Sequence, residues 1–246
     1  MYYQPVVHSG TGVIVGSEAL VRWLHPRHGL LTPDKFLVAS EEIELMEPLG
    51  DWILHKACGQ AQEWQSIDPA NAFTMAVNLS APEMFSADLI GRVESALHAA
   101  GLPARFLVLE ITERIMMADF ALATRQLQDL RRLGVRIAID DFGTGYSSLA
   151  YLRQLPIDIL KIDRSFIAPL GSDHQALPLL RSIVGITDAL HLEVVVEGAE
   201  TAAQVELLDD LGCHIVQGFY FGRPTKAEDL GSRLSWAREL RITVQP

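Results

Sequence analysis

Residues 120–141, FALATRQLQDLRRLGVRIAIDD, combine a helical pattern, a glycine, a strand-like run and two acids. The apolar periodicity predicts a helix over Phe120–Leu133 that ends at Gly134, since glycine accepts the left-handed conformation that closes helices. The run Val135–Ile139 is short and continuously apolar, which is typical of a strand buried on both faces. Asp140 and Asp141 follow at its carboxyl end.

The same alternation of strand and helix extends in both directions, and it predicts parallel strands joined by helical crossovers. The other expected strands are Tyr2–Val7, Val13–Val15 running on to Trp23, Phe73–Leu79, Phe106–Ile111, Ile157–Ile162, Leu192–Val196 and Ile215–Phe219. The other expected helices are Leu49–Ile67, Asp88–Ala100, Ala176–Leu190 and Thr201–Leu211.

About eight strands in a chain of 246 residues favour a closed α/β barrel of the TIM (β/α)8 type over an open doubly wound sheet, which is the alternative. No low-complexity stretch or Ser/Gly-rich linker divides the chain, so we expect a single domain over residues 1–246. Because the chain begins almost directly in a strand-like run, we expect it to come from a longer protein.

Composition narrows the classes of function. The chain is 49% hydrophobic and 21% charged, which excludes disordered, collagen-like and coiled-coil proteins. Its net charge of −11 disfavours binding to a nucleic acid polymer or an anionic membrane. Cys58 and Cys213 indicate buried core thiols in a reducing compartment. Without a signal peptide or transmembrane run, we expect a cytoplasmic chain, or the cytoplasmic part of a membrane-anchored protein.

Polar residues recur where the expected strands end. In a parallel barrel these ends share one face, where barrel enzymes have their active sites. One such acid would be interpreted as a helix cap or a solvated loop residue, but seven successive strand ends indicate one shared pocket. The strand-end residues are Glu18, Asn78, Glu110 with Glu113, Asp140 with Asp141, Lys161 with Asp163, Glu197 with Glu200, and Gln217.

The acids at these ends point to bound cations. Eight of the strand-end residues are acids. Without these eight the chain has 20 basic and 23 acidic residues, so much of its net negative charge belongs to the expected site. Carboxylates cannot gather as anions in a partly buried pocket unless something positive holds them. The donors are all oxygen atoms, which favours Mg²⁺ or Mn²⁺ over zinc or copper. The histidines show no shared ligand spacing.

The ordered motifs resemble the EAL domain, the family of cyclic di-GMP-specific phosphodiesterases. The resemblance runs from Tyr3 to about Pro224. The motifs are Tyr3-Gln4-Pro5, Glu18-Ala19-Leu20 with Val21-Arg22-Trp23, Asn78-Leu79-Ser80, Glu110-Ile111-Thr112-Glu113, Asp140-Asp141-Phe142-Gly143-Thr144-Gly145-Tyr146-Ser147-Ser148, Lys161-Ile162-Asp163, Glu197-Gly198-Ala199-Glu200 and Gln217-Gly218-Phe219.

The resemblance implies a modified TIM barrel whose first strand is antiparallel, and hydrolysis of cyclic di-GMP to linear pGpG with two divalent cations, Mg²⁺ or Mn²⁺. It implies metal ligands at Glu18, Asn78, Glu110, Asp140, Asp141 and Glu197. It assigns catalytic roles to Lys161, which would orient the attacking water, to Glu197 as a base, and to Gln217. It implies substrate contacts from Gln4, Leu20 and Arg22, and makes Glu113 and Glu200 the acids that hold the loop after Asp141.

The resemblance also implies a homodimer, with the loop after Asp141 near the subunit interface, and regulatory domains outside this chain that serve bacterial signalling. Two departures from the family pattern are Ala199 in place of a valine and His214 in place of an aspartate. Neither is at an expected metal ligand.

Two other functions stay open at this point. One is a receptor that binds cyclic di-GMP without cleaving it, although such receptors usually lose some of the acids and none is missing here. The other is a lysine Schiff-base aldolase using Lys161. Acids crowding that lysine would favour its protonated form, which suits the water-orienting role better.

Overall fold

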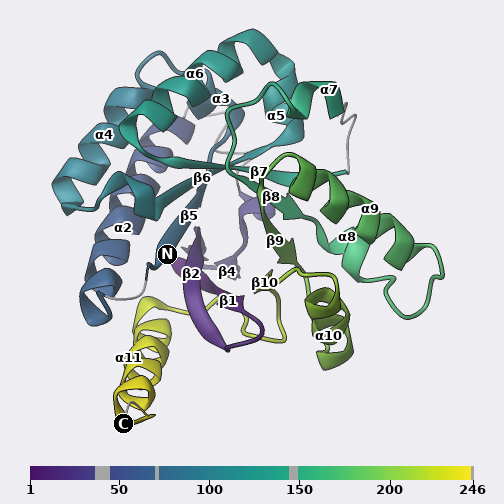
Figure 1. The fold of residues 1–246 in the computed structure, drawn as a ribbon. Helices are drawn as coiled ribbons and strands as arrows, with labels where there is room; N and C mark the ends of the chain where they lie inside the picture. The colour runs from purple at the N-terminus through teal and green to yellow at the C-terminus, as the bar shows by residue number, and fades with distance from the viewer. Residues whose placement is uncertain (37–44, 70–71, 144–148, 245–246) are drawn as a thin grey trace.

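The computed structural model describes residues 1–36, 45–69, 72–143 and 149–244. Eight strands close into a barrel in the order β1-β10-β9-β8-β7-β6-β5-β2 (Figure 1). The expected α/β barrel is therefore confirmed, and the open sheet is excluded. The barrel strands are β1 (Tyr2–His8), β2 (Val13–Leu20), β5 (Thr74–Asn78), β6 (Leu107–Thr112), β7 (Arg136–Phe142), β8 (Ile159–Ile162), β9 (Glu193–Glu197) and β10 (Ile215–Gln217).

The first strand is the exception to the parallel arrangement. β1 pairs antiparallel with both of its neighbours, β2 and β10, while the other neighbouring strands of the barrel pair parallel. This confirms the antiparallel first strand. It also means that the amino-terminal half of β1 lies beside the carboxyl ends of the other strands, with Gln4 opposite Glu18.

Helices pack around the outside of the barrel (Figure 1). Glycine closes two of them: Gly101 and Gly134 take positive φ angles of 65° and 91° and donate their N–H groups to the last turn, and Gly134 is the predicted end of its helix. The longer helices are α2 (Met46–Ile67), α4 (Leu89–Ala100), α6 (Phe120–Leu133), α9 (Ala176–Ala189), α10 (Ala202–Asp210) and α11 (Ala227–Val244).

Short elements complete the described chain. The strand expected to run on to Trp23 ends instead at Leu20, and Trp23 opens a separate two-stranded hairpin. This hairpin and α11 are absent from the sequence prediction. The short elements are the hairpin strands β3 (Trp23–His25) and β4 (Gly29–Leu31), the 3-10 turns η1 (Pro33–Lys35) and η2 (Ala104–Phe106), and the helices α3 (Ala81–Met84), α5 (Glu113–Ala118), α7 (Leu149–Leu152) and α8 (Arg164–Ile167).

The apolar core has two layers. The larger one lies between the barrel and the helices and includes Leu109, Leu127 and Cys58, all fully buried. The smaller one lies inside the barrel. The inner side chains alternate along each strand with the outer ones, as the period of a strand requires. The inner layer consists of Ala76, Val108, Ala138, Ile159 and Val195.

Candidate active site

Lys161 lies at the centre of the polar cluster at the carboxyl ends of the strands. Its side chain on β8 is only 2% exposed. Its Nζ lies 2.6 Å from Glu197 Oε1 and 2.8 Å from Glu110 Oε2. Two further carboxylates, Asp140 at 3.5 Å and Glu18 at 3.8 Å, complete its surroundings. Residues 18, 110, 140, 161 and 197, from five strands, therefore meet at one point.

Glu18 connects this cluster to two side-chain amides. The Nδ2 of Asn78 donates a hydrogen bond of 2.6 Å to one oxygen of Glu18, and the Nε2 of Gln217 donates one of 2.6 Å to the other. Gln217 also contacts Gln4, whose Oε1 lies 3.3 Å from its Nε2. The amides hold the Glu18 carboxylate in place at the seam where β1 and β2 meet.

The cluster contains four acids and one base, and burial changes how readily each of them ionises. Burial raises the pKa of Glu110 well above its ordinary value, and burial raises the pKa of Glu197 to about 7. Burial also opposes ionisation of Glu18, but the Lys161 ammonium and the hydrogen bonds from Gln217 and Asn78 lower its pKa overall. The surrounding carboxylates outweigh burial at Lys161 and raise its pKa, so this side chain is a cation.

The donor set fits hard divalent cations. In the described ranges, no three acid, histidine or cysteine side chains form a ready metal-binding group; instead, the Lys161 ammonium lies between the carboxylates. Four acids surround a single ammonium, and the Asn78 side chain is hydrogen-bonded to one of them, Glu18. Oxygen donors of this kind suit Mg²⁺ or Mn²⁺.

Asp141 lies one residue beyond this group. It has a φ of 54°, a left-handed conformation that costs energy for a residue with a side chain, and its N–H donates to Asp140 Oδ1 at 2.9 Å. Burial, with Asp140 and Asp163 nearby, raises the pKa of Asp141. The backbone thus turns sharply at the end of β7, directly before the loop that the motif predicts.

A pocket of about 220 Å³ opens above the cluster and forms the mouth of the site. Gln4 and Leu20, both expected to contact substrate, line this mouth pocket, as do Glu18, Asp140 and Glu197. Arg22 does not line it. Its guanidinium donates to the Val21 carbonyl at 2.9 Å, so a substrate contact from this residue stays a prediction.

The two acids expected to hold the loop after Asp141 both belong to the described part of the chain. Glu113 is buried at the start of α5, and Glu200 is exposed at the mouth pocket. The loop residues 144–148 lie outside the described part of the chain, so the predicted contacts are not tested. The mouth also includes Arg164 and Phe219, which the sequence prediction did not assign to it. Their positions directly after β8 and β10 are the signal that could have revealed them.

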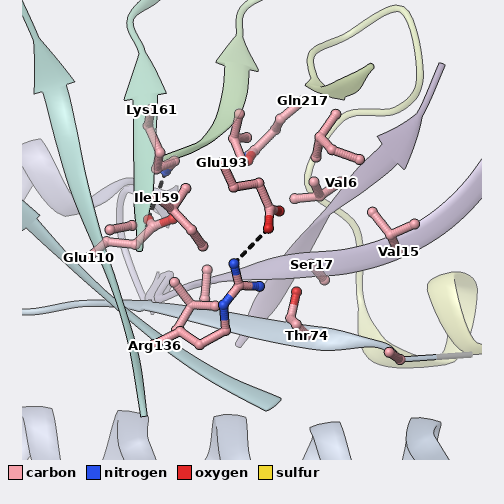
Figure 2. A pocket seen from close by; sticks show the side chains of 16 residues that line it. Val6, Val15, Ser17, Thr74, Glu110, Arg136, Ile159, Lys161, Glu193 and Gln217 are labelled. Carbon is pink, nitrogen blue, oxygen red and sulfur yellow. Dashed lines mark hydrogen bonds and ion pairs between the residues drawn. The ribbon is translucent and has the colours of Figure 1, made fainter. Parts of the chain in front are cut away.

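A second cavity of about 230 Å³ lies behind the cluster, inside the barrel (Figure 2). Glu110, Lys161 and Gln217 line the end nearer the mouth. At the rear end, Arg136 Nη2 and Glu193 Oε2 form an ion pair of 2.6 Å. The end of the barrel that holds Lys161 and the rear end therefore carry separate charged groups.

Comparison with known proteins agrees with this geometry. The EAL domain family model matches residues 1–224, so the chain belongs to the EAL domain family. It is 45% identical over 231 residues to the bifunctional diguanylate cyclase/cyclic di-GMP phosphodiesterase MucR of Pseudomonas aeruginosa, covering 94% of this chain and 33% of MucR. It is 43% identical to the cyclic di-GMP phosphodiesterase NbdA of the same organism, covering 91% of this chain and 28% of NbdA.

A solved structure of the MucR phosphodiesterase in complex with c-di-GMP superposes with a TM-score of 0.88 at 45% identity, covering 93% of this chain and 92% of that one. The chain spans about a third of the length of the curated relatives quoted above. Among the described helices, none has the length and apolar character needed to cross a membrane.

Proposed function

We propose that this chain hydrolyses cyclic di-GMP to linear pGpG in a reaction that depends on two divalent cations. The observation that carries the proposal is the gathering of Glu18, Glu110, Asp140 and Glu197 around the buried Lys161 ammonium. The relatives named as cyclic di-GMP phosphodiesterases support the substrate.

Each side chain has a defined task in this reaction. Glu18, Asn78, Glu110 and Asp140 would hold one ion, and Asp140, Asp141 and Glu197 the second. Bound divalent cations supply charge neutralisation on the phosphoryl oxygens and an acidified water. A water oxygen attacks phosphorus, and the bond from phosphorus to a ribose 3′ oxygen breaks, with that oxygen taking up a proton.

The chain's own groups position the water. Lys161 is a buried cation whose ammonium has three protons to donate, so it can hold the attacking oxygen in one place. Glu197, whose Oε1 lies 2.6 Å from Lys161 Nζ, would accept the proton of a water held there. Gln217 keeps Glu18 oriented through its 2.6 Å hydrogen bond and fixes the shape of the site.

The test of this function is a turnover assay with a control from the same strand. The protein is incubated with cyclic di-GMP and Mg²⁺ or Mn²⁺, with and without chelator, and pGpG is measured by chromatography. Glu197→Gln should abolish turnover, while Glu193→Gln at the rear of β9 should keep it. Product formation in chelator, or no product with either ion while an active relative works in parallel, would reject the proposal. Tight binding without cleavage would instead favour the receptor function.

We also propose that the chain works as a homodimer in the cytoplasm and belongs to a longer signalling protein. The greater length of the relatives supports further regulatory domains. Met117 on α5 and Tyr151 on α7 are exposed and line one small pocket with Phe142 of β7, and this apolar surface supports a subunit interface there. The rate per subunit should fall on dilution that dissociates the dimer, and an unchanged rate would remove this part of the proposal.

A further inference from the structure

One basic side chain lines the mouth pocket in the described part of the chain, and it belongs to Arg164. The same pocket is lined by four acids, Glu18, Asp140, Glu197 and Glu200. A cyclic dinucleotide carries two phosphates. If one of them enters the acid cluster for cleavage, the second meets a field from the remaining carboxylates and needs a cation of its own.

The position of Arg164 is fixed from two sides. It is the first residue of α8, and the Asp163 side chain caps this turn by accepting from Ser165 N at 2.9 Å. On the other side, Gly198 has a φ of 76°, and a Cβ there would lie 2.2 Å from the Cβ of Arg164. The side chain therefore begins in close contact with the segment that carries Glu197 and Glu200, and its far end is exposed at the mouth.

The Arg164 guanidinium interacts electrostatically with the neighbouring Asp163 carboxylate, but it has no hydrogen bond or close ion pair among the residues that the structure describes. Three other arginines of the chain have partners within the protein. Arg22 donates to the Val21 carbonyl, Arg136 pairs with Glu193, and Arg223 lies over the ring of Phe219 at 4.0 Å. Arg164 thus offers a planar pair of donors at the mouth, a shape that matches two nonbridging oxygens of a phosphate.

We propose that Arg164 binds the second, uncleaved phosphate of the cyclic dinucleotide. This rests on the proposed function, because it assigns a substrate contact in the same site. The contact forms in the ground state and persists while the other phosphate reacts. Its loss should therefore raise KM and leave kcat nearly constant, as expected when uniform binding is removed.

The experiment compares Arg164→Met, Arg164→Lys and a control, Arg181→Met, which removes an exposed positive charge from α9. Steady-state kinetics with Mg²⁺ should give Arg164→Met a KM for cyclic di-GMP about 10- to 100-fold above wild type, the range for a hydrogen bond to a charged group. Arg164→Lys should recover part of this loss, and Arg181→Met should match wild type.

A second probe separates phosphate recognition from base recognition. The dinucleotide GpG has the same two guanines and a single phosphodiester. Calorimetry with Ca²⁺ as the added metal should show weaker binding of cyclic di-GMP by Arg164→Met and unchanged binding of GpG. Equal losses for the two ligands would assign Arg164 to a base and overturn the proposal.

A fall in kcat at constant KM would also overturn it, because the arginine would then act by packing on the Glu197 segment. Since calorimetry reports binding without turnover, a wild-type chain that binds but does not cleave would refute the proposed function and still leave the Arg164 comparison decisive.

Discussion

Replacing Lys161 with methionine removes the ammonium from a site where four carboxylates lie within 3.8 Å of it. Breaking a buried ion pair by removing one partner costs about 3–5 kcal/mol, because uncompensated charge stays behind. For a chain of this size each kcal/mol changes Tm by roughly 2–4 °C, so Lys161→Met should melt about 6–20 °C below wild type in chelator.

Two changes of condition should reduce this difference. Mn²⁺ should raise the Tm of Lys161→Met more than that of wild type, since bound cations supply the missing positive charge. Acidification from pH 8 to pH 6 should act in the same direction. Burial raises the pKa of Glu110 and of Glu197, and the Lys161 ammonium opposes this rise. Without the ammonium both values should be higher still, so the folded variant takes up more protons and gains more stability than wild type as the pH falls.

Thermal melts followed by circular dichroism provide the assay, and Lys56→Met on the exposed face of α2 provides the matched control, which should melt close to wild type. If Lys161→Met has the same Tm as wild type in chelator at pH 8, the four acids do not carry negative charge that the ammonium has to balance. The electrostatic argument for the site would then be wrong.

Two further predictions concern parts of the fold that support the site. Arg92→Met should lower the free energy of unfolding by about 3 kcal/mol, because it leaves Glu83 buried without its cation. Burial raises the pKa of Glu83, so this loss of stability, measured by urea titration, should become smaller as the pH falls from 7 to 5. An equal loss at the two pH values would contradict this prediction. Gly218→Ala should reduce both Tm and turnover, since its Cβ would lie 2.1 Å from the Ala199 carbonyl oxygen. The control Gly59→Ala, in open space on α2, should raise the free energy of unfolding by up to about 1 kcal/mol. Equal behaviour of the two variants would show that the backbone around Gly218 can shift to accept the methyl group.

Much of the fold follows from sequence pattern because the barrel strands are short, apolar and separated by helices with clear ends. Gly134, for example, marks the end of α6 by its conformation. The pattern does not predict α11, where Leu230 and Leu234 are buried but Trp236 is exposed, so the apolar face is hard to recognise. The end of β2 at Leu20 is hidden for a similar reason, since the apolar run continues into the hairpin.

The convergence of the acids is predictable because parallel strands end on one face. The place of Lys161 among them is not, because it depends on inward-pointing side chains from four other strands. The place of Arg164 and the presence of the rear cavity are not predictable either. Arg164 is positioned by its contact with Gly198, and the cavity depends on small inner residues such as Ala76 and Ala138.

The reversed direction of β1 has a mechanical consequence. Tyr2 pairs with Leu20 and Gln4 with Glu18, so the first residue of the chain lies at the same end of the barrel as the carboxylates. A displacement applied at Met1 would pass along Tyr2 and Tyr3 to Gln4. Gln4 contacts Gln217, which in turn is hydrogen-bonded to Glu18. Tension on this strand would therefore act on the reactive centre through the strand's own side chains.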